Sequence, residues 1–220
     1  LLMDTIDAPE KVEGLMDAIT GGYEEHHALR EREGRLNVFS MDGGKYRAAN
    51  IWRVIAWADS GIEDGGKPRL ADEWAYVSAQ SAAGLGPEAF ERFAHKYNAR
   101  LARLFTKRTV YYHGCERLDH KLDVLATLPD LRRLHVSPWS SVAAARDRFR
   151  GNVVLEIHSH PGKVFFTMTP DDMRREIRGL IDAAEGVPMD LNLSDINSVN
   201  GRPELLTTWA RIAQEESARR

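Results

Sequence analysis

The sequence has little cysteine: Cys115 is the single thiol among 220 residues. One cysteine cannot form a disulfide within the chain, so the sequence does not describe a disulfide-stapled secreted scaffold. We therefore expect a reducing, cytoplasmic setting. In that setting a lone thiol is a small buried apolar group, a metal ligand or a reactive nucleophile.

Long apolar runs and an excess of one charge are also missing. No apolar stretch approaches the roughly 18 residues that a membrane-spanning helix needs, so no membrane partner is expected. The 30 basic and 33 acidic residues give a formal charge of −3 without a basic stripe, so nucleic acid is not an expected partner either. A hydrophobic content of 43% and a charged content of 29% are typical of a globular protein, and the partner we expect is a small-molecule substrate.

What the sequence does contain is a regular alternation of strand and helix patterns from about residue 71 to residue 220. Each short apolar run that predicts a strand is followed by a segment with apolar residues at helical spacing. The expected strands comprise residues 73–78, 109–112, 131–136, 152–157 and 189–193, and the expected helices comprise residues 87–105, 118–128, 141–149, 170–184 and 203–216. Such alternation predicts parallel strands joined by right-handed crossovers.

The first 70 residues are less regular. A helix is expected over residues 8–33, since apolar side chains recur on one face, and a short strand over residues 36–40. Residues 44–70 predict a loop with a short buried helix at residues 52–57, and such an excursion is often a lid or a site loop. We expect one structural domain, with residues 1–70 as its irregular N-terminal part and the remainder as its regular βα units.

The strand count favours an incomplete barrel. Six strands are expected from Leu36 onward, whereas a (β/α)8 barrel needs eight strands and about 250 residues. An open doubly wound sheet is the alternative, but Gly84-Leu85-Gly86 lacks the third glycine of a dinucleotide-binding turn. We therefore expect the C-terminal part of a (β/α)8 barrel, with some N-terminal βα units missing. Its unpaired strand edge would favour a homodimer or aggregation.

Polar side chains that suit zinc follow the expected strand at residues 109–112. His113 and Cys115 are separated only by Gly114, which leaves room for a tight bend, so both side chains can converge at the strand end. An imidazole and a thiolate are typical zinc ligands. A His-x-Cys pair is common by chance, but the carboxyl ends of parallel strands meet at one rim of the sheet, and this position favours a metal site.

Two further strand ends supply candidates for the same rim. His158 and His160 lie two residues apart after the strand at residues 152–157, so in an extended chain both would point to one face. They could complete a His/His/Cys ligand set or bind a substrate carboxylate, and a polar loop with one hydrogen-bonded histidine is the simpler alternative. Asp195 follows the strand at residues 189–193 and could ligate metal, orient a ligating histidine, act as a base or merely cap a helix.

Weaker candidates lie at the ends of the two earlier strands. Gln80 and Ser78 could exchange hydrogen bonds with a substrate, and Asp42 ends the first strand. The candidate catalytic residues are therefore Asp195, His158 and Gln80, and the candidate metal ligands are His113, Cys115 and His160.

Three motifs make the chain resemble the uroporphyrinogen decarboxylase superfamily. They are YYHGCE at residues 111–116, LRRLHVSPW at residues 131–139 and QSAAGLGPEAF at residues 80–90. The likeness is closest to members found beside the cobalamin-dependent methyltransferases, and it covers most of the chain from Trp74 to Trp209. It implies a (β/α)8 barrel, usually longer than this chain, with its site at the carboxyl ends of the strands.

The resemblance also implies a chemistry. In the superfamily's methyltransferases a His-x-Cys after a strand and a later cysteine bind zinc, which activates a thiol as methyl acceptor. His113 and Cys115 match the first two ligands. Ser194 and Asp195 stand near the place of the later cysteine, so the third ligand would be His160 or Asp195. The implied function is zinc-assisted methyl transfer to a thiol or similar acceptor, from a corrinoid carried by a partner corrinoid protein.

Two other functions stay open at this point. A metal-independent decarboxylase or lyase would bind a polycarboxylate through His158, His160 and Arg132 or Arg133. A non-catalytic barrel would bind a small ligand or a protein partner, with Cys115 packed in the interior. Metal analysis distinguishes the first function from both alternatives.

Overall fold

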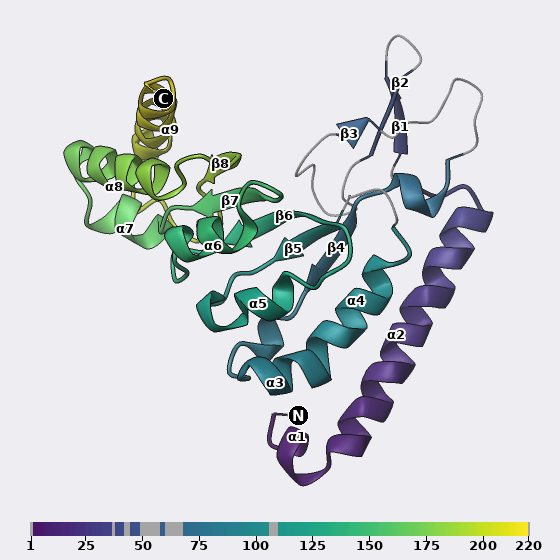
Figure 1. Cartoon of the computed structure of the whole chain (residues 1–220). Coiled ribbons are helices and arrows are strands. Elements are labelled where there is room, and N and C mark those ends of the chain that lie inside the picture. The colour runs from purple at the N-terminus through teal and green to yellow at the C-terminus, as the bar shows by residue number, and fades with distance from the viewer. Residues whose placement is uncertain are drawn as a thin grey trace. The chain divides into compact units, whose positions relative to one another are not determined.

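The computed structural model describes residues 2–36, 38–41, 45–48, 58–59, 68–105 and 110–219. The chain forms two compact units (Figure 1). The first unit comprises Leu1–His113 and His120–Arg133, and the second comprises Gly114–Asp119 and Leu134–Arg220. The predicted short helix at residues 52–57 lies outside the described residues. Among the described residues, no helix combines the length and the apolar character needed to cross a bilayer.

The described strands form two sheets. An antiparallel sheet of order β1-β2-β3 contains β1 (Val38–Met41), β2 (Lys45–Ala48) and β3 (Ala58–Asp59). A parallel sheet of order β4-β5-β6-β7-β8 contains β4 (Ala75–Ser78), β5 (Val110–His113), β6 (Leu131–Val136), β7 (Val154–His158) and β8 (Met189–Asn192). The predicted parallel α/β architecture is confirmed, and closure into a barrel stays a prediction.

The strand predicted at residues 36–40 is present, but it does not join the parallel sheet. As β1 it pairs with β2, with Val38 opposite Ala48 and Met41 opposite Lys45. Strands β2 and β3 were not predicted, because runs of four and two residues are too short to show an alternating pattern.

The helices of the first unit lie before β6 in the sequence. Its helices are α1 (Asp4–Asp7), α2 (Pro9–Arg32), η1 (Leu70–Asp72), η2 (Gln80–Ala82), α3 (Pro87–Phe90), the π-helical η3 (Glu91–His95), α4 (Lys96–Ala102) and α5 (Leu122–Leu125), and η4 (Asp119–Lys121) begins at the junction of the units. Helix α2 lies beside α4 (Figure 1). Ion pairs join α2 to η3 and α4: Arg92 of η3 and Lys96 of α4 donate to Glu13 at 2.9 and 3.0 Å and hold its pKa at about 2.

His27 on α2 makes the first unit sensitive to acid. The pKa of His27 is lowered from 6.5 to about 4, mainly by burial and to a smaller extent by the nearby Arg30 and His26. Between pH 6.5 and pH 4 the His27 side chain is protonated in the unfolded chain and neutral in the folded chain. The free energy of unfolding therefore falls as the pH is lowered from 6.5 to 4. We expect His27→Gln to reduce the fall in melting temperature over this interval. His120→Gln, at an exposed position of the first unit, is the control, and an equal fall in His27→Gln and wild type would contradict the assignment.

The second unit packs its helices around an apolar core. Its helices are α6 (Val142–Phe149), α7 (Pro161–Phe166), α8 (Pro170–Ala183) and α9 (Glu204–Ser217). Buried side chains of the last three helices form one cluster, which comprises Val164, Phe165, Met173, Ile177, Ile181, Leu205, Trp209, Ile212 and Ala213. These helices therefore fix the loops that follow β7 and β8.

Local sequence explains how two of these helices begin. Thr169 caps α8, because its hydroxyl accepts from the Asp172 backbone N–H while the Asp172 carboxylate accepts from the Thr169 N–H. Helix α7 was not predicted, since Pro161-Gly162 suggests a turn. Pro161 instead stands at the first helical position, where a missing N–H costs nothing.

Gly114 is required by a close approach of side chain and backbone. A Cβ built at this position would lie 2.4 Å from Leu118 Cδ1 and 3.0 Å from the carbonyl oxygen of His135. We expect Gly114→Ala to lower the free energy of unfolding by about 1–3 kcal/mol, the usual cost of overpacking, as measured by denaturant titration. Gly179→Ala, within α8 and with nothing within 4 Å of its Cβ, should be neutral or stabilising. Equal stability of Gly114→Ala and wild type would contradict the packing argument.

Candidate functional site

A cavity of about 360 Å³ lies in the second unit, where β6, β7 and β8 end. Its walls come from the ends of β6 and β7, from the residues that follow β5, β6, β7 and β8, and from α7. The lining residues are Cys115, His135, Ser137, Pro138, Trp139, His158, Ser159, His160, Pro161, Gly162, Phe166, Ser194, Asp195, Asn197 and Ser198. The carboxyl ends of parallel strands therefore build a cavity, as the strand-end pattern predicts.

Three buried side chains gather at the ends of β6 and β7. His135, Glu156 and His158 are 1%, 1% and 4% exposed. Each offers one potential ligand atom, and these atoms all lie within 4.8 Å of one another. Glu156 and His158 share a face of β7 because side chains alternate along a strand. The structure thus contains a buried His/Glu/His grouping that could hold a metal ion.

A chain of hydrogen bonds runs through His158. Its Nε2 lies 2.7 Å from Glu156 Oε1, and its Nδ1 lies 2.9 Å from the Ser194 hydroxyl. A carboxylate can only accept, so Nε2 carries the proton, and in the neutral ring Nδ1 accepts from Ser194. The carboxylate of Glu156 therefore fixes both the tautomer and the orientation of the imidazole.

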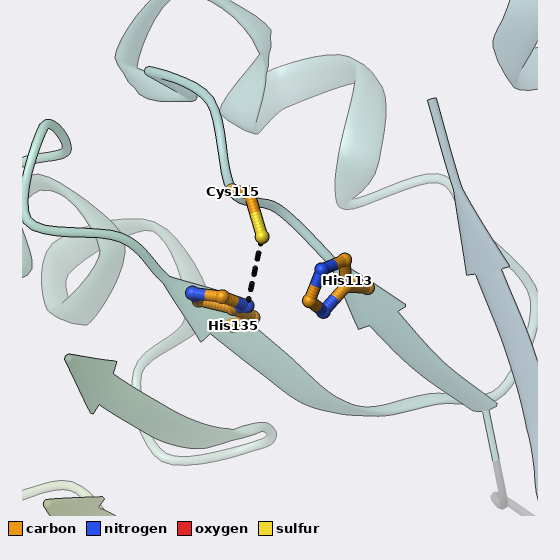
Figure 2. Close-up of side chains that lie close together, drawn as sticks. All are labelled: His113, Cys115 and His135. Carbon is orange, nitrogen blue, oxygen red and sulfur yellow. Dashed lines mark hydrogen bonds between the residues drawn. The ribbon is translucent and has the colours of Figure 1, made fainter. Parts of the chain in front are cut away.

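His135 connects this chain to the cysteine. The His135 and His158 rings stack, with centroids 3.7 Å apart and planes 16° apart. On β6, the Nδ1 of His135 also lies 3.9 Å from Cys115 Sγ, and Figure 2 shows the thiol directed at this ring. Cys115 is half-buried and lines the cavity, so it is not sealed in the apolar core.

His113, the other half of the predicted His-x-Cys pair, ends β5 in the first unit. Its Nδ1 lies 3.2 Å from the Tyr111 hydroxyl, and its ring stacks on Tyr76 at 5.4 Å. Figure 2 draws its side chain beside the strand end. The site described here is confined to residues of the second unit, and His113 stays a predicted ligand.

His160 and Asp195 both line the cavity, outside the His/Glu/His grouping. His160 makes an edge contact with Trp139, with ring centroids 4.9 Å apart, and its Nδ1 is buried without a hydrogen-bond partner among the described residues. Asp195 is exposed and has a left-handed backbone, with a φ of 58°. Gln80 begins η2 in the first unit and is exposed.

Ser159 lines the cavity and links the end of β7 to α9. Its hydroxyl accepts from the Trp209 indole N–H of α9 at 3.2 Å. Burial raises the pKa of the Glu176 carboxyl of α8, and Ser159, Lys163 and His160 oppose that rise. Ser159 therefore ties the histidine-bearing turn to the helical core.

Sequence reasoning missed His135 and Glu156. His135 has no diagnostic spacing, because its neighbours in space come from another strand. Glu156 carried a signal that was available: a carboxylate inside the apolar run Val153 to Ile157 must be buried, and a buried carboxylate needs a partner.

Comparison of the chain with models of known protein families finds no match, and comparison with curated proteins finds none either.

Proposed function

We propose that the chain is part of a uroporphyrinogen-decarboxylase-like barrel protein whose second unit holds a zinc ion for methyl transfer. The observation that supports it is the buried grouping of His135, Glu156 and His158, two of which, His135 and His158, line the cavity. Two imidazoles and one carboxylate are a ligand set of catalytic zinc sites, which keep a further position open for a substrate or water.

Zinc binding would require a local movement of the ligands, because the stacked His135 and His158 rings would have to turn before both could direct a nitrogen at one ion. Ligand atoms at the usual zinc bond lengths stand about 3.4 Å apart in a tetrahedral site, and here they lie within 4.8 Å of one another. Ser194 would hold the His158 ring from its other nitrogen, which is the role of outer-sphere partners at metal sites. Cys115 would act in the same way on His135.

The proposed ligand set differs from the one that the resemblance implies. There, His113 and Cys115 bind zinc with His160 or Asp195; here, His135, Glu156 and His158 do so. A bound zinc ion would lower the pKa of a substrate thiol or water and so supply a nucleophile at neutral pH. The methyl donor proposed from the resemblance is a corrinoid on a partner protein.

Elemental analysis of the purified full chain tests the proposal. We expect close to one zinc ion per chain, removable by a chelator and restored by added zinc. His135→Ala should lose this metal, whereas His120→Ala, at an exposed position outside the cavity, should keep it. Absence of zinc from the wild type after reconstitution would overturn the proposal.

A second candidate function needs no metal. Ser194 donates to His158 and His158 donates to Glu156, which is the arrangement of a hydroxyl nucleophile, its base and the group that orients the base. If this chain is catalytic, a phosphonyl fluoride should label Ser194 in metal-free protein, and Ser194→Ala should abolish the labelling. Unlabelled metal-free protein would rule against this candidate.

A further inference from the structure

One side of the cavity is aromatic and unusually exposed. Trp139 is 59% exposed and Phe166 is 54% exposed, and both line the cavity. The His160 ring meets Trp139 edge to face, which leaves the indole supported in one orientation. Large aromatic side chains that are exposed and line a cavity are typical of ligand-binding sites.

The other side of the cavity, which follows β8, is polar and acidic. Asp195 lines it with an exposed carboxylate, and Asn197 and Ser198 add neutral polar groups. Asp195 holds a φ of 58°, a left-handed conformation that is uncommon for residues other than glycine, asparagine and aspartate. The carboxylate is therefore placed by a specific turn of the backbone.

Lysine and arginine are absent from the described residues that line this cavity, and its basic side chains are the three histidines His135, His158 and His160. A ligand with several carboxylates would find no guanidinium or ammonium among these residues, whereas a positively charged ligand would meet the Asp195 carboxylate and the rings of Trp139 and Phe166.

We propose that this cavity binds a small organic cation, an ammonium carrying methyl groups, between the Trp139 ring and the Asp195 carboxylate. A methylated ammonium has an apolar surface that suits aromatic rings, and a positive charge that is attracted to their faces. The cavity volume of about 360 Å³ is sufficient for such a ligand. Since it names the ligand class of the same cavity, the inference rests on the proposed function.

Choline and its neutral isostere 3,3-dimethyl-1-butanol provide a matched pair of probes. We would titrate each into the metal-free full chain and follow heat and tryptophan fluorescence. We expect choline to bind at least about tenfold more tightly than the isostere, and Trp139→Leu and Asp195→Asn each to weaken choline binding about fivefold to thirtyfold. Asp195→Asn should leave binding of the isostere unchanged.

The variants are chosen to keep the fold. Trp139 is exposed, and asparagine tolerates the left-handed backbone of Asp195. Asp171→Asn, exposed on α8 outside the cavity, is the charge-matched control. Equal affinity for choline and the isostere, or full choline affinity in both Trp139→Leu and Asp195→Asn, would overturn the inference.

Measurement on metal-free protein separates the two proposals. Choline binding by a chain that never takes up zinc supports the cation site and rejects the zinc site. A chain that binds one zinc ion but binds choline and its isostere equally well would support the zinc site and reject the cation site.

Discussion

Glutamine in place of Glu156 is expected to weaken zinc binding by more than about a hundredfold, the upper end of the loss seen when outer-sphere partners are removed. The substitution keeps the size and the hydrogen-bonding oxygen of the side chain, so His158 Nε2 retains an acceptor. It removes the negative charge, which is the only one that the His/Glu/His grouping brings to a divalent ion. Competition against a chelator of known affinity measures the loss.

The control for Glu156→Gln is Glu185→Gln, which changes the same charge at an exposed position after α8. Its zinc affinity should equal that of the wild type. The melting temperature of metal-free Glu156→Gln should show that the variant is folded. A folded Glu156→Gln that competes for zinc as strongly as the wild type would remove Glu156 from the ligand set.

Trp209→Ala is expected to cost the second unit about 3–5 kcal/mol of unfolding free energy, as large aromatic truncations in cores do. Trp209 is 7% exposed within the cluster of α7, α8 and α9, and its indole N–H donates to Ser159 at 3.2 Å. Trp209→Phe keeps most of the apolar contact and loses the hydrogen bond, so it should cost only about 1 kcal/mol.

Urea titration of the full chain measures both losses. Leu206→Ala, at a position of α9 that is 40% exposed, is the control and should change stability by less than about 0.5 kcal/mol. Equal costs for Trp209→Ala and Leu206→Ala would show that α9 does not depend on the core contact. A larger cost for Trp209→Phe than for Trp209→Ala would contradict the assigned order of apolar packing and hydrogen bonding.

The regular part of the fold could be predicted from sequence because its signals are local. Strand β6 has the predicted bounds, α8 begins at the predicted residue 170, and α9 begins one residue after the predicted position. The helix predicted at residues 118–128 is divided into the 3-10 helix η4 and the short helix α5. Buried Lys121, at the end of η4, donates to the Ala82 carbonyl at 2.9 Å, a partner that the sequence does not reveal.

The location of the candidate site could be predicted from the sequence, but several of its residues could not. Polar residues after strands indicated the rim where the cavity lies, and His158, Asp195, Cys115 and His160 all line it. The stacking of His135 on His158 depends on which strands are neighbours and in what register they pair. Neither property is encoded in the local pattern of a single strand.

The bond between Glu156 and His158 bears on how the protein would behave without an ion. Zinc-finger domains unfold when stripped, because nothing else holds their ligands together. Here the hydrogen bond between the Glu156 carboxylate and the His158 imidazole already orients both side chains, in a unit with its own apolar core. Removal of the proposed zinc ion by a chelator should therefore leave the protein folded. Binding of added zinc would then require only a local exchange of hydrogen-bond partners for metal bonds, not a refolding step.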